Sequence, residues 1–116
     1  MQWNFRTVVF AVLAAAGALL TWYFNLQFSI ETGGGFNLAA FIRDGFANPA
    51  AASLTSDVSV AAVTFLLWLP FEARRLSMRR WWLYALLTVT VAFAFSFPLF
   101  LLMRERRLQQ LNTATA

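Results

Sequence analysis

The sequence predicts an all-α integral membrane protein with three transmembrane helices and one short interfacial amphipathic helix. Hydrophobic residues make up 60% of the 116 residues and charged residues only 12%, against about 45–50% and about 25% in soluble domains. The apolar residues also come in three long blocks, each near the ~20 residues that a helix needs to cross a bilayer. We expect spans over about 7–28, 49–73 and 81–103, an interfacial helix over about 37–46, and a single membrane domain over 1–116.

The first block, TVVFAVLAAAGALLTWYFNLQF, has two interpretations. Its alanines resemble the small-residue cleavage site of a signal peptide. The apolar run continues past them from Leu19 to Phe24, so we expect a retained helix. Small residues let membrane helices approach closely, and one stripe of this helix carries four of them: Ala11, Ala14, Ala15 and Ala18.

The segment after the first block, ETGGGFNLAAFIRDGFANP, predicts a break followed by a short helix. Three glycines interrupt the chain, and Asn37 can cap the helix that follows. Opposite Arg43 and Asp44, apolar residues recur at helical spacing: Leu38, Phe41, Ile42 and Phe46. This pattern is typical of a helix that lies flat in the membrane interface.

The second block contains an aspartate whose depth depends on where the helix begins. Asn48 followed by Pro49 is a strong start signal, and it puts Asp57 about 12 Å into the helix at ~1.5 Å per residue. A start at Ser56 would leave Asp57 at the surface, but only about 16 residues would then remain before Phe71, fewer than a span needs. We therefore expect a submerged carboxylate that faces protein, because an ionised Asp in lipid costs ~2.5–3.5 kcal/mol.

At matching depth the three spans offer hydrogen-bonding partners to this carboxylate. We expect a polar cluster in which Asp57 bonds at least one of four side chains: Ser53, Ser96, Thr21 and Asn25. Two roles stay open. Such groups commonly join membrane helices by hydrogen bonds; alternatively, Asp57 is a catalytic or proton-carrying acid.

The third block, WWLYALLTVTVAFAFSFPLFLLM, runs from Trp81 to Met103 without a charge and predicts one continuous spanning helix. With three spans, the amino terminus and the 74–80 loop share one side and hold five arginines, while the other side holds four. Cytoplasmic loops carry the excess of Lys and Arg. We therefore expect a protein of the inner (plasma) membrane with its amino terminus in the cytoplasm and its carboxyl terminus outside.

The turn FEARRLSMRRW carries a second carboxylate, Glu72, with Arg75 as a partner at i+3. Glu72 lies about 22 Å from Asp57 along a helix, so the two cannot form an acid–base pair. We expect Glu72 and Arg75 to hold the shape of this turn. As an exposed pair, they predict that Glu72→Gln costs little beyond ~1 kcal/mol.

The chain has no cysteine and no histidine. Thiolate metal sites, the usual zinc and haem ligands and the usual general base are thereby removed, and we expect no metal and no other cofactor. The net charge of +4 fits anchoring at lipid headgroups and not a nucleic-acid surface, which would alternate basic and stacking aromatic residues. The expected partners are membrane lipids, together with other membrane-protein subunits or further copies of this chain.

Five pieces of the sequence carry a resemblance: GFNLAAF, FANPAAAS, the Asp57 of TSD, FEARRLSM with Glu72 and Arg75, and FPLFLLMRER with Pro98 and Arg104. Over most of its length the chain resembles the small bacterial membrane proteins grouped as domain of unknown function family 2834. The resemblance implies a three-helix membrane protein with no assigned activity. Ser96-Phe97 departs from the Ala-Leu that this family carries before Pro-Leu-Phe, so a cluster member at Ser96 is peculiar to this chain.

Two classes of function remain. The first is an accessory or scaffold subunit, not an enzyme, that packs in a larger membrane assembly. The alternative is a membrane-embedded enzyme or proton relay acting on a lipid or isoprenoid, with Asp57 as the acid. Three helices barely enclose a pocket, so an enzyme would need a dimer. Large partner chains would favour the first class, and a lipid-like ligand beside Asp57 the second.

Overall fold

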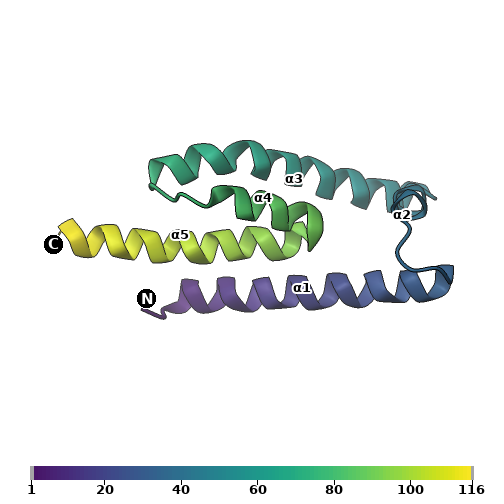
Figure 1. The fold of residues 1–116 in the computed structure, drawn as a ribbon, viewed down its shortest axis with the longest axis horizontal. Coiled ribbons are helices and arrows are strands. Elements are labelled where there is room, and N and C mark those ends of the chain that lie inside the picture. The colour runs from purple at the N-terminus through teal and green to yellow at the C-terminus, as the bar shows by residue number, and fades with distance from the viewer. Residues whose placement is uncertain (1, 116) are drawn as a thin grey trace.

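The structure is a computed structural model that describes residues 2–115, with the side chains of residues 2–113. Within these residues it consists of five helices: α1 (Phe5–Thr32), α2 (Leu38–Gly45), α3 (Pro49–Arg75), α4 (Trp81–Thr90) and α5 (Phe93–Thr115). They form an elongated bundle with extents of 56 × 25 × 24 Å, in which α1, α3 and the α4–α5 pair run side by side (Figure 1). The all-helical prediction is confirmed.

The starts of α1 and α2 follow from their capping residues. The Asn4 side chain accepts a hydrogen bond from the Thr7 amide at 3.0 Å, and the Thr7 hydroxyl accepts one from the Asn4 amide at 2.9 Å. This reciprocal pair satisfies amides that a helix start otherwise leaves free. Asn37 caps α2 in a similar way through the Ala40 amide. The expected short helix after the glycines is therefore present.

The start of α3 confirms the earlier of the two expected positions. Asn48 caps the helix through the Ala51 amide at 2.8 Å, and Pro49 is the first helical residue. Asp57 therefore lies about 12 Å along α3. The helix continues through Pro70 to Arg75 and is followed by a tight turn in which Ser77 has a positive φ of 56°.

The expectation of one continuous helix over 81–103 is wrong. The chain turns back at Val91 and Ala92, and α4 and α5 form an antiparallel hairpin (Figure 1). The turn comes at the end of the run TVTV, residues 88–91, whose β-branched side chains weaken a helix. In a straight helix Thr88 and Ser96 would be about 12 Å apart, but here their hydroxyls are 2.6 Å apart. The reversal thus lets two polar groups in an apolar block satisfy each other.

The hairpin changes the position of the carboxyl terminus. Helix α5 runs back along α1, so that residues 104–113 lie beside the start of the chain (Figure 1). The Gln2 amide donates to the Gln109 side chain and the Gln109 side-chain amide donates to the Gln2 carbonyl, each at 3.0 Å. Residues near both termini therefore lie at the same end of the bundle, whereas three continuous spans would place them at opposite ends.

Small residues allow α5 to lie directly on α1. Ala14 is buried, Ala11 and Ala18 are half-buried, and Ala15 is exposed, so three of the four expected alanines face the partner helix. Gly17 makes the closest approach: a Cβ atom there would lie 2.0 Å from the Ala94 carbonyl oxygen. No larger residue fits at this crossing without separating the helices.

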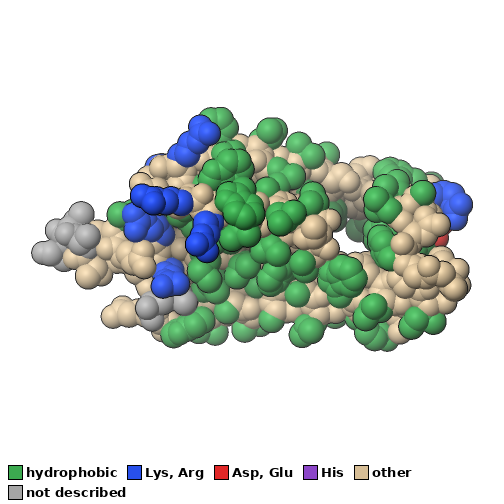
Figure 2. Space-filling model, in the orientation of Figure 1, with side chains coloured by type: hydrophobic (Ala, Val, Ile, Leu, Met, Phe, Trp, Pro, Cys, Tyr) green, Lys and Arg blue, Asp and Glu red, His purple; other side chains and the backbone are tan. Residues whose placement is uncertain are grey.

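The core is small and lies between α3 and the hairpin. Phe65, Leu69 and Phe100 are buried together, and the rings of Trp68 and Tyr84 meet Phe100 edge to face at 5.5 and 5.2 Å. Only eight hydrophobic residues of the described chain are buried. In contrast, many large apolar side chains are exposed along the helices (Figure 2).

Candidate functional site: a charged end, an aromatic groove and an uncovered half

Glu72 is the centre of an ion cluster that joins two helices. The guanidinium of Arg75 donates to both of its carboxylate oxygens, at 2.6 and 3.1 Å. Arg104 of α5 donates to the same carboxylate at 2.8 Å. Glu72 is buried, with 10% of its side chain exposed. The expected contact with Arg75 is present, but the cluster also ties α5 to α3 and is not an exposed pair.

The sequence did not predict Arg104 as a partner of Glu72, because three continuous spans would put these two residues at opposite ends of the helix bundle. The hairpin brings not only Arg104 but the whole basic tail back to the turn after α3. Arg107 donates to the Leu76 carbonyl at 2.7 Å, and Arg6 lies 4.0 Å from Glu105.

Eight of the nine arginines therefore lie on helix ends and a loop that meet at one end of the molecule, and Figure 2 shows basic side chains gathered there. This arginine end comprises Arg6, Arg74, Arg75, Arg79, Arg80, Arg104, Arg106 and Arg107. Glu72 and Glu105 offset two of these charges, which leaves a net +6 there. The rest of the chain holds Arg43 with Glu31, Asp44 and Asp57, a net −2, and the two parts sum to the +4 of the sequence.

The tip of the hairpin is held by side chains from α1 and α5. The Trp22 indole donates to the Val91 carbonyl at 2.7 Å, which satisfies backbone that the helix break leaves free. Ser96 is buried and shares its bond with Thr88. Ser96, which we expected beside Asp57, thus supports the reversal of the chain together with Trp22.

Asp57 lies on α3 with its side chain exposed. Ser53 is exposed as well, and Thr21 and Asn25 are half-buried on α1. Among the described residues, no hydrogen bond joins Asp57 to any of the four side chains expected around it. The structure therefore does not bring the expected polar cluster together within this chain. Across the part of the chain that the structure describes, no group of three or more His, Cys, Asp or Glu side chains could hold a metal.

One face of α3 is buried along half of its length and exposed along the other half. Leu54, Val58, Phe65 and Leu69 recur at helical spacing on this face. Phe65 and Leu69, which lie against the hairpin, are 3% and 0% exposed, whereas Leu54 and Val58 are 68% and 54% exposed. The hairpin reaches only part of the way along α3 (Figure 1), and Figure 2 shows a hollow between it and α2. We call residues 49–60 of α3 the uncovered segment.

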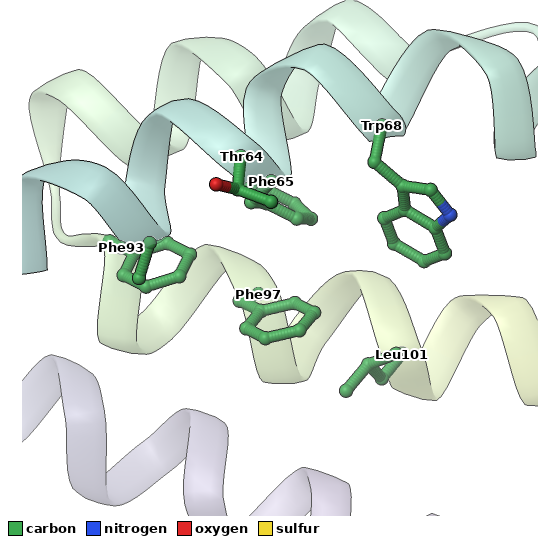
Figure 3. Close-up of a pocket in the computed structure, with 7 residues that line it drawn as sticks. Thr64, Phe65, Trp68, Phe93, Phe97 and Leu101 are labelled. Carbon is green, nitrogen blue, oxygen red and sulfur yellow. The ribbon is translucent and has the colours of Figure 1, made fainter.

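A groove with a volume of about 390 Å³ runs between α3 and α5. It is lined from α3 by Ala61, Thr64, Phe65 and Trp68, and from α5 by Phe93, Phe97 and Leu101 (Figure 3). Stacked rings of Phe93 and Phe97, with centroids 5.4 Å apart, form one wall. The Thr64 hydroxyl already donates to the Val60 carbonyl at 2.8 Å. The groove is therefore an apolar channel that follows the helix axes.

The comparison with family models identifies the chain. Residues 9–106 match the family described as "Protein of unknown function DUF2834". The chain belongs to this family. The match includes the Glu72–Arg104 pair, Asp57 and the groove, and it confirms the resemblance found in the sequence. Searches of curated proteins and of solved structures gave no match.

Proposed function

We propose that this member of the DUF2834 family is an integral membrane protein with two spanning helices and a re-entrant hairpin, and that it serves as an accessory subunit of a larger membrane assembly. In the described chain, α1 and α3 are long and apolar enough to cross a membrane. Each helix contains an apolar stretch of 18 residues, and only 11% of that stretch is buried in α1 and 6% in α3. The core helix of a soluble protein would hide most of such a stretch.

The hairpin fits a membrane that it enters without crossing. Helix α4 has 10 residues, or about 15 Å at ~1.5 Å per residue, half of a ~30 Å hydrocarbon core. Irregular backbone at that depth is tolerated only where protein covers and satisfies it. The Trp22 indole donates such a bond to the Val91 carbonyl, and the Val91 and Ala92 amides both donate to the Leu87 carbonyl.

The charges support an orientation with the arginine end in the cytoplasm. The three-span arrangement divides the arginines five to four, whereas the hairpin divides them eight to one. An excess of Lys and Arg near the ends of membrane helices marks the cytoplasmic side. Both termini of the chain are then cytoplasmic, and the plasma membrane is the compartment that we favour.

The uncovered segment of α3 is the observation that carries the role of a subunit. Its apolar face is exposed at Leu54 and Val58, and its carboxylate at Asp57 has no partner among the described residues. An unpaired Asp at this depth costs ~2.5–3.5 kcal/mol in lipid. A helix of another subunit that lies in the hollow, with a basic or hydrogen-bond-donating side chain opposite Asp57, would remove this cost and would pack against Leu54 and Val58. A second copy of this chain packed through the same face would set two carboxylates against each other.

The enzymatic alternative requires Asp57 to face a substrate pocket. Asp57 does not line the groove and lies one helical turn beyond its last α3 residue, Ala61. We therefore favour the subunit. In that role, the Asp57 carboxylate is a recognition group for a partner helix.

Photo-crosslinking in native membranes tests this proposal. A photo-reactive amino acid replaces Val58, which faces the hollow. In the matched control it replaces Val60, which lies on the opposite face at nearly the same depth and is 67% exposed. We expect a crosslink from Val58 to another membrane protein and none from Val60. Asp57→Asn, which keeps shape and polarity, should retain the crosslink, and Asp57→Leu should lose it.

Three outcomes would count against the proposal. Crosslinks from Val58 to lipid alone would remove the partner, and crosslinks only to another copy of the chain would replace it with a homo-oligomer. If Asp57→Leu kept the same crosslink as the unmodified protein, the carboxylate would have no part in recognition.

A further inference from the structure

The groove between α3 and α5 opens toward a cluster of positive charge. Arg104 lies three residues beyond Leu101 on α5, or about 4.5 Å along the helix, and Glu72 lies four residues beyond Trp68 on α3, or about 6 Å. Their 2.8 Å bond therefore joins the two groove helices just past the last residues that line the groove. Arg75 completes this end of the groove, with 59% of its side chain exposed.

The charge at this end is not balanced. Arg104 lies within 4.0 Å of both Glu72 and Glu105. Arg75 pairs with Glu72 and Arg6 with Glu105, so three arginines face two carboxylates and one positive charge is left over. Four more arginines lie near it on the loop after α3 and on the last turns of α5: Arg79, Arg80, Arg106 and Arg107. Basic pockets between membrane helices on the cytoplasmic side select lipids with anionic headgroups.

Trp68 marks where the apolar part of the groove ends. Its ring packs against Phe65 and Phe100, while its indole nitrogen points along α5 past Leu101, toward the arginine end (Figure 3). Among the described residues this nitrogen has no hydrogen-bond partner. A tryptophan whose ring lies among apolar groups and whose N–H faces polar ones is typical of the level of lipid ester groups.

The shape of the groove limits what can occupy it. Its α5 wall runs from Phe93 to Leu101, about 12 Å at ~1.5 Å per residue, and the Phe65 and Phe97 rings, with centroids 4.9 Å apart, are in contact and close its floor. A narrow channel parallel to the helices fits an extended hydrocarbon chain. Because lipid tails are as apolar as the groove itself, the tail alone confers little selectivity. The headgroup therefore decides which lipid stays.

We infer that the groove holds an acyl chain of an anionic glycerophospholipid, whose phosphate lies against Arg75 and Arg104 and whose ester region meets the Trp68 indole. The inference rests on the membrane location proposed above and needs no partner subunit. The bound lipid fills the channel between α3 and α5 and balances the charge of the ion cluster that joins them.

Native mass spectrometry of the detergent-purified full chain tests this inference. The protein is titrated with phosphatidylglycerol and with phosphatidylcholine of the same acyl chains. We expect phosphatidylglycerol to be retained at least about fivefold more than phosphatidylcholine. Arg75→Gln should reduce its retention about fivefold, the equivalent of ~1 kcal/mol for one basic contact. Arg74→Gln is the matched control, because Arg74 is exposed at the same end but lies about a third of a turn from the Trp68 face.

A second variant tests the tail separately from the headgroup. Ala61→Trp fills the groove from an exposed position, so it should lower retention of both lipids without unfolding the protein. Val63→Trp, on the outward face of α3 and 55% exposed, should leave retention unchanged.

Equal retention of the two lipids would overturn the inference, and so would equal losses in Arg74→Gln and Arg75→Gln, which would indicate general surface charge. Tighter retention of a polyprenyl phosphate than of phosphatidylglycerol would replace the acyl chain with an isoprenoid. Because the isolated chain is measured, absence of lipid selectivity alongside a crosslink at Val58 would remove this inference alone. Recovery of the chain in the soluble fraction would remove both proposals.

Discussion

The two halves of the molecule differ in how they satisfy their polar and apolar groups. In the half that contains the arginine end, the α4–α5 hairpin covers α1 and α3, and Glu72, Ser96 and Thr7 are buried with hydrogen-bond partners. In the other half the two long helices run without the hairpin, and Asp57 is exposed without a partner among the described residues. One half pairs its buried polar groups within the chain, and the other leaves a carboxylate and an apolar helix face that the chain does not cover.

This difference follows from the length of the hairpin. Helix α4 ends after 10 residues, so the hairpin cannot reach the far ends of helices of 28 and 27 residues. Hydrophobic residues of α3 on the same face are therefore core residues at Phe65 and surface residues at Val58. The burial of a side chain here depends on its depth along the helix as much as on its type.

The largest expected effect concerns the side on which the chain ends. Reporter fusions after Arg80 and after Ala116 should both report the cytoplasm, because the hairpin returns the chain to the arginine end. A fusion in the glycine loop at Gly34 should report the opposite side. Opposite signals from the fusions at Arg80 and Ala116 would restore the three-span arrangement and remove the hairpin from the membrane-bound protein.

A smaller effect is expected when the ion cluster is broken. Glu72→Gln should lower the free energy of unfolding by about 3 kcal/mol, the low end of the range for breaking a buried pair. Removal of the carboxylate leaves Arg104, only 27% exposed, without its partner across the helices, while Arg75 can turn to water. This value exceeds the ~1 kcal/mol expected from an exposed pair. Unfolding of the purified protein in detergent by added dodecyl sulfate measures it.

The control for Glu72 comes from the other half of the molecule. Arg43 and Asp44 form an ion pair at 3.5 Å with both side chains exposed, so Asp44→Asn should cost no more than ~1 kcal/mol. Similar losses in the two variants would mean that Glu72 does not hold α5 against α3.

The sequence predicted the parts of the fold that depend on local signals. The caps at Asn37 and Asn48 set the starts of α2 and α3, and the ~20 residues that a span needs favoured the start at Pro49 over one at Ser56. The sequence did not predict the hairpin, because an apolar block of spanning length has the same composition whether it forms one straight helix or two helices folded back on each other. Thr88 and Ser96 within that block were a signal of the reversal, since in a straight helix they would be about 12 Å apart and could not bond each other.

The candidate site was harder to predict than the helices. Glu72 and Arg75 are neighbours at i+3 and could be paired from the sequence, whereas Arg104, the groove and the gathering of eight arginines all depend on the hairpin. The partners expected for Asp57 came from matching depths across three straight spans. Once the third span is divided, Ser96 lies at a different depth and bonds Thr88.

The smallest expected effect tests the packing of the covered half directly. Gly17→Ala puts a methyl group where only 2.0 Å separates it from the backbone oxygen of Ala94. Backbone cannot move aside as a flexible side chain does, so α5 has to shift away from α1, and overpacking of this kind costs about 1–3 kcal/mol. In a lone helix the same change would stabilise the helix by about 1 kcal/mol. The sign of the change in unfolding free energy therefore separates the effect of helix packing from that of helix propensity.

Gly34→Ala is the control. Nothing lies within 4 Å of the added atom there, so this change should leave the unfolding midpoint unchanged. If Gly17→Ala instead stabilised the protein in the dodecyl sulfate titration, α1 and α5 could not be in contact at this position, and the hairpin would have to lie elsewhere on α1.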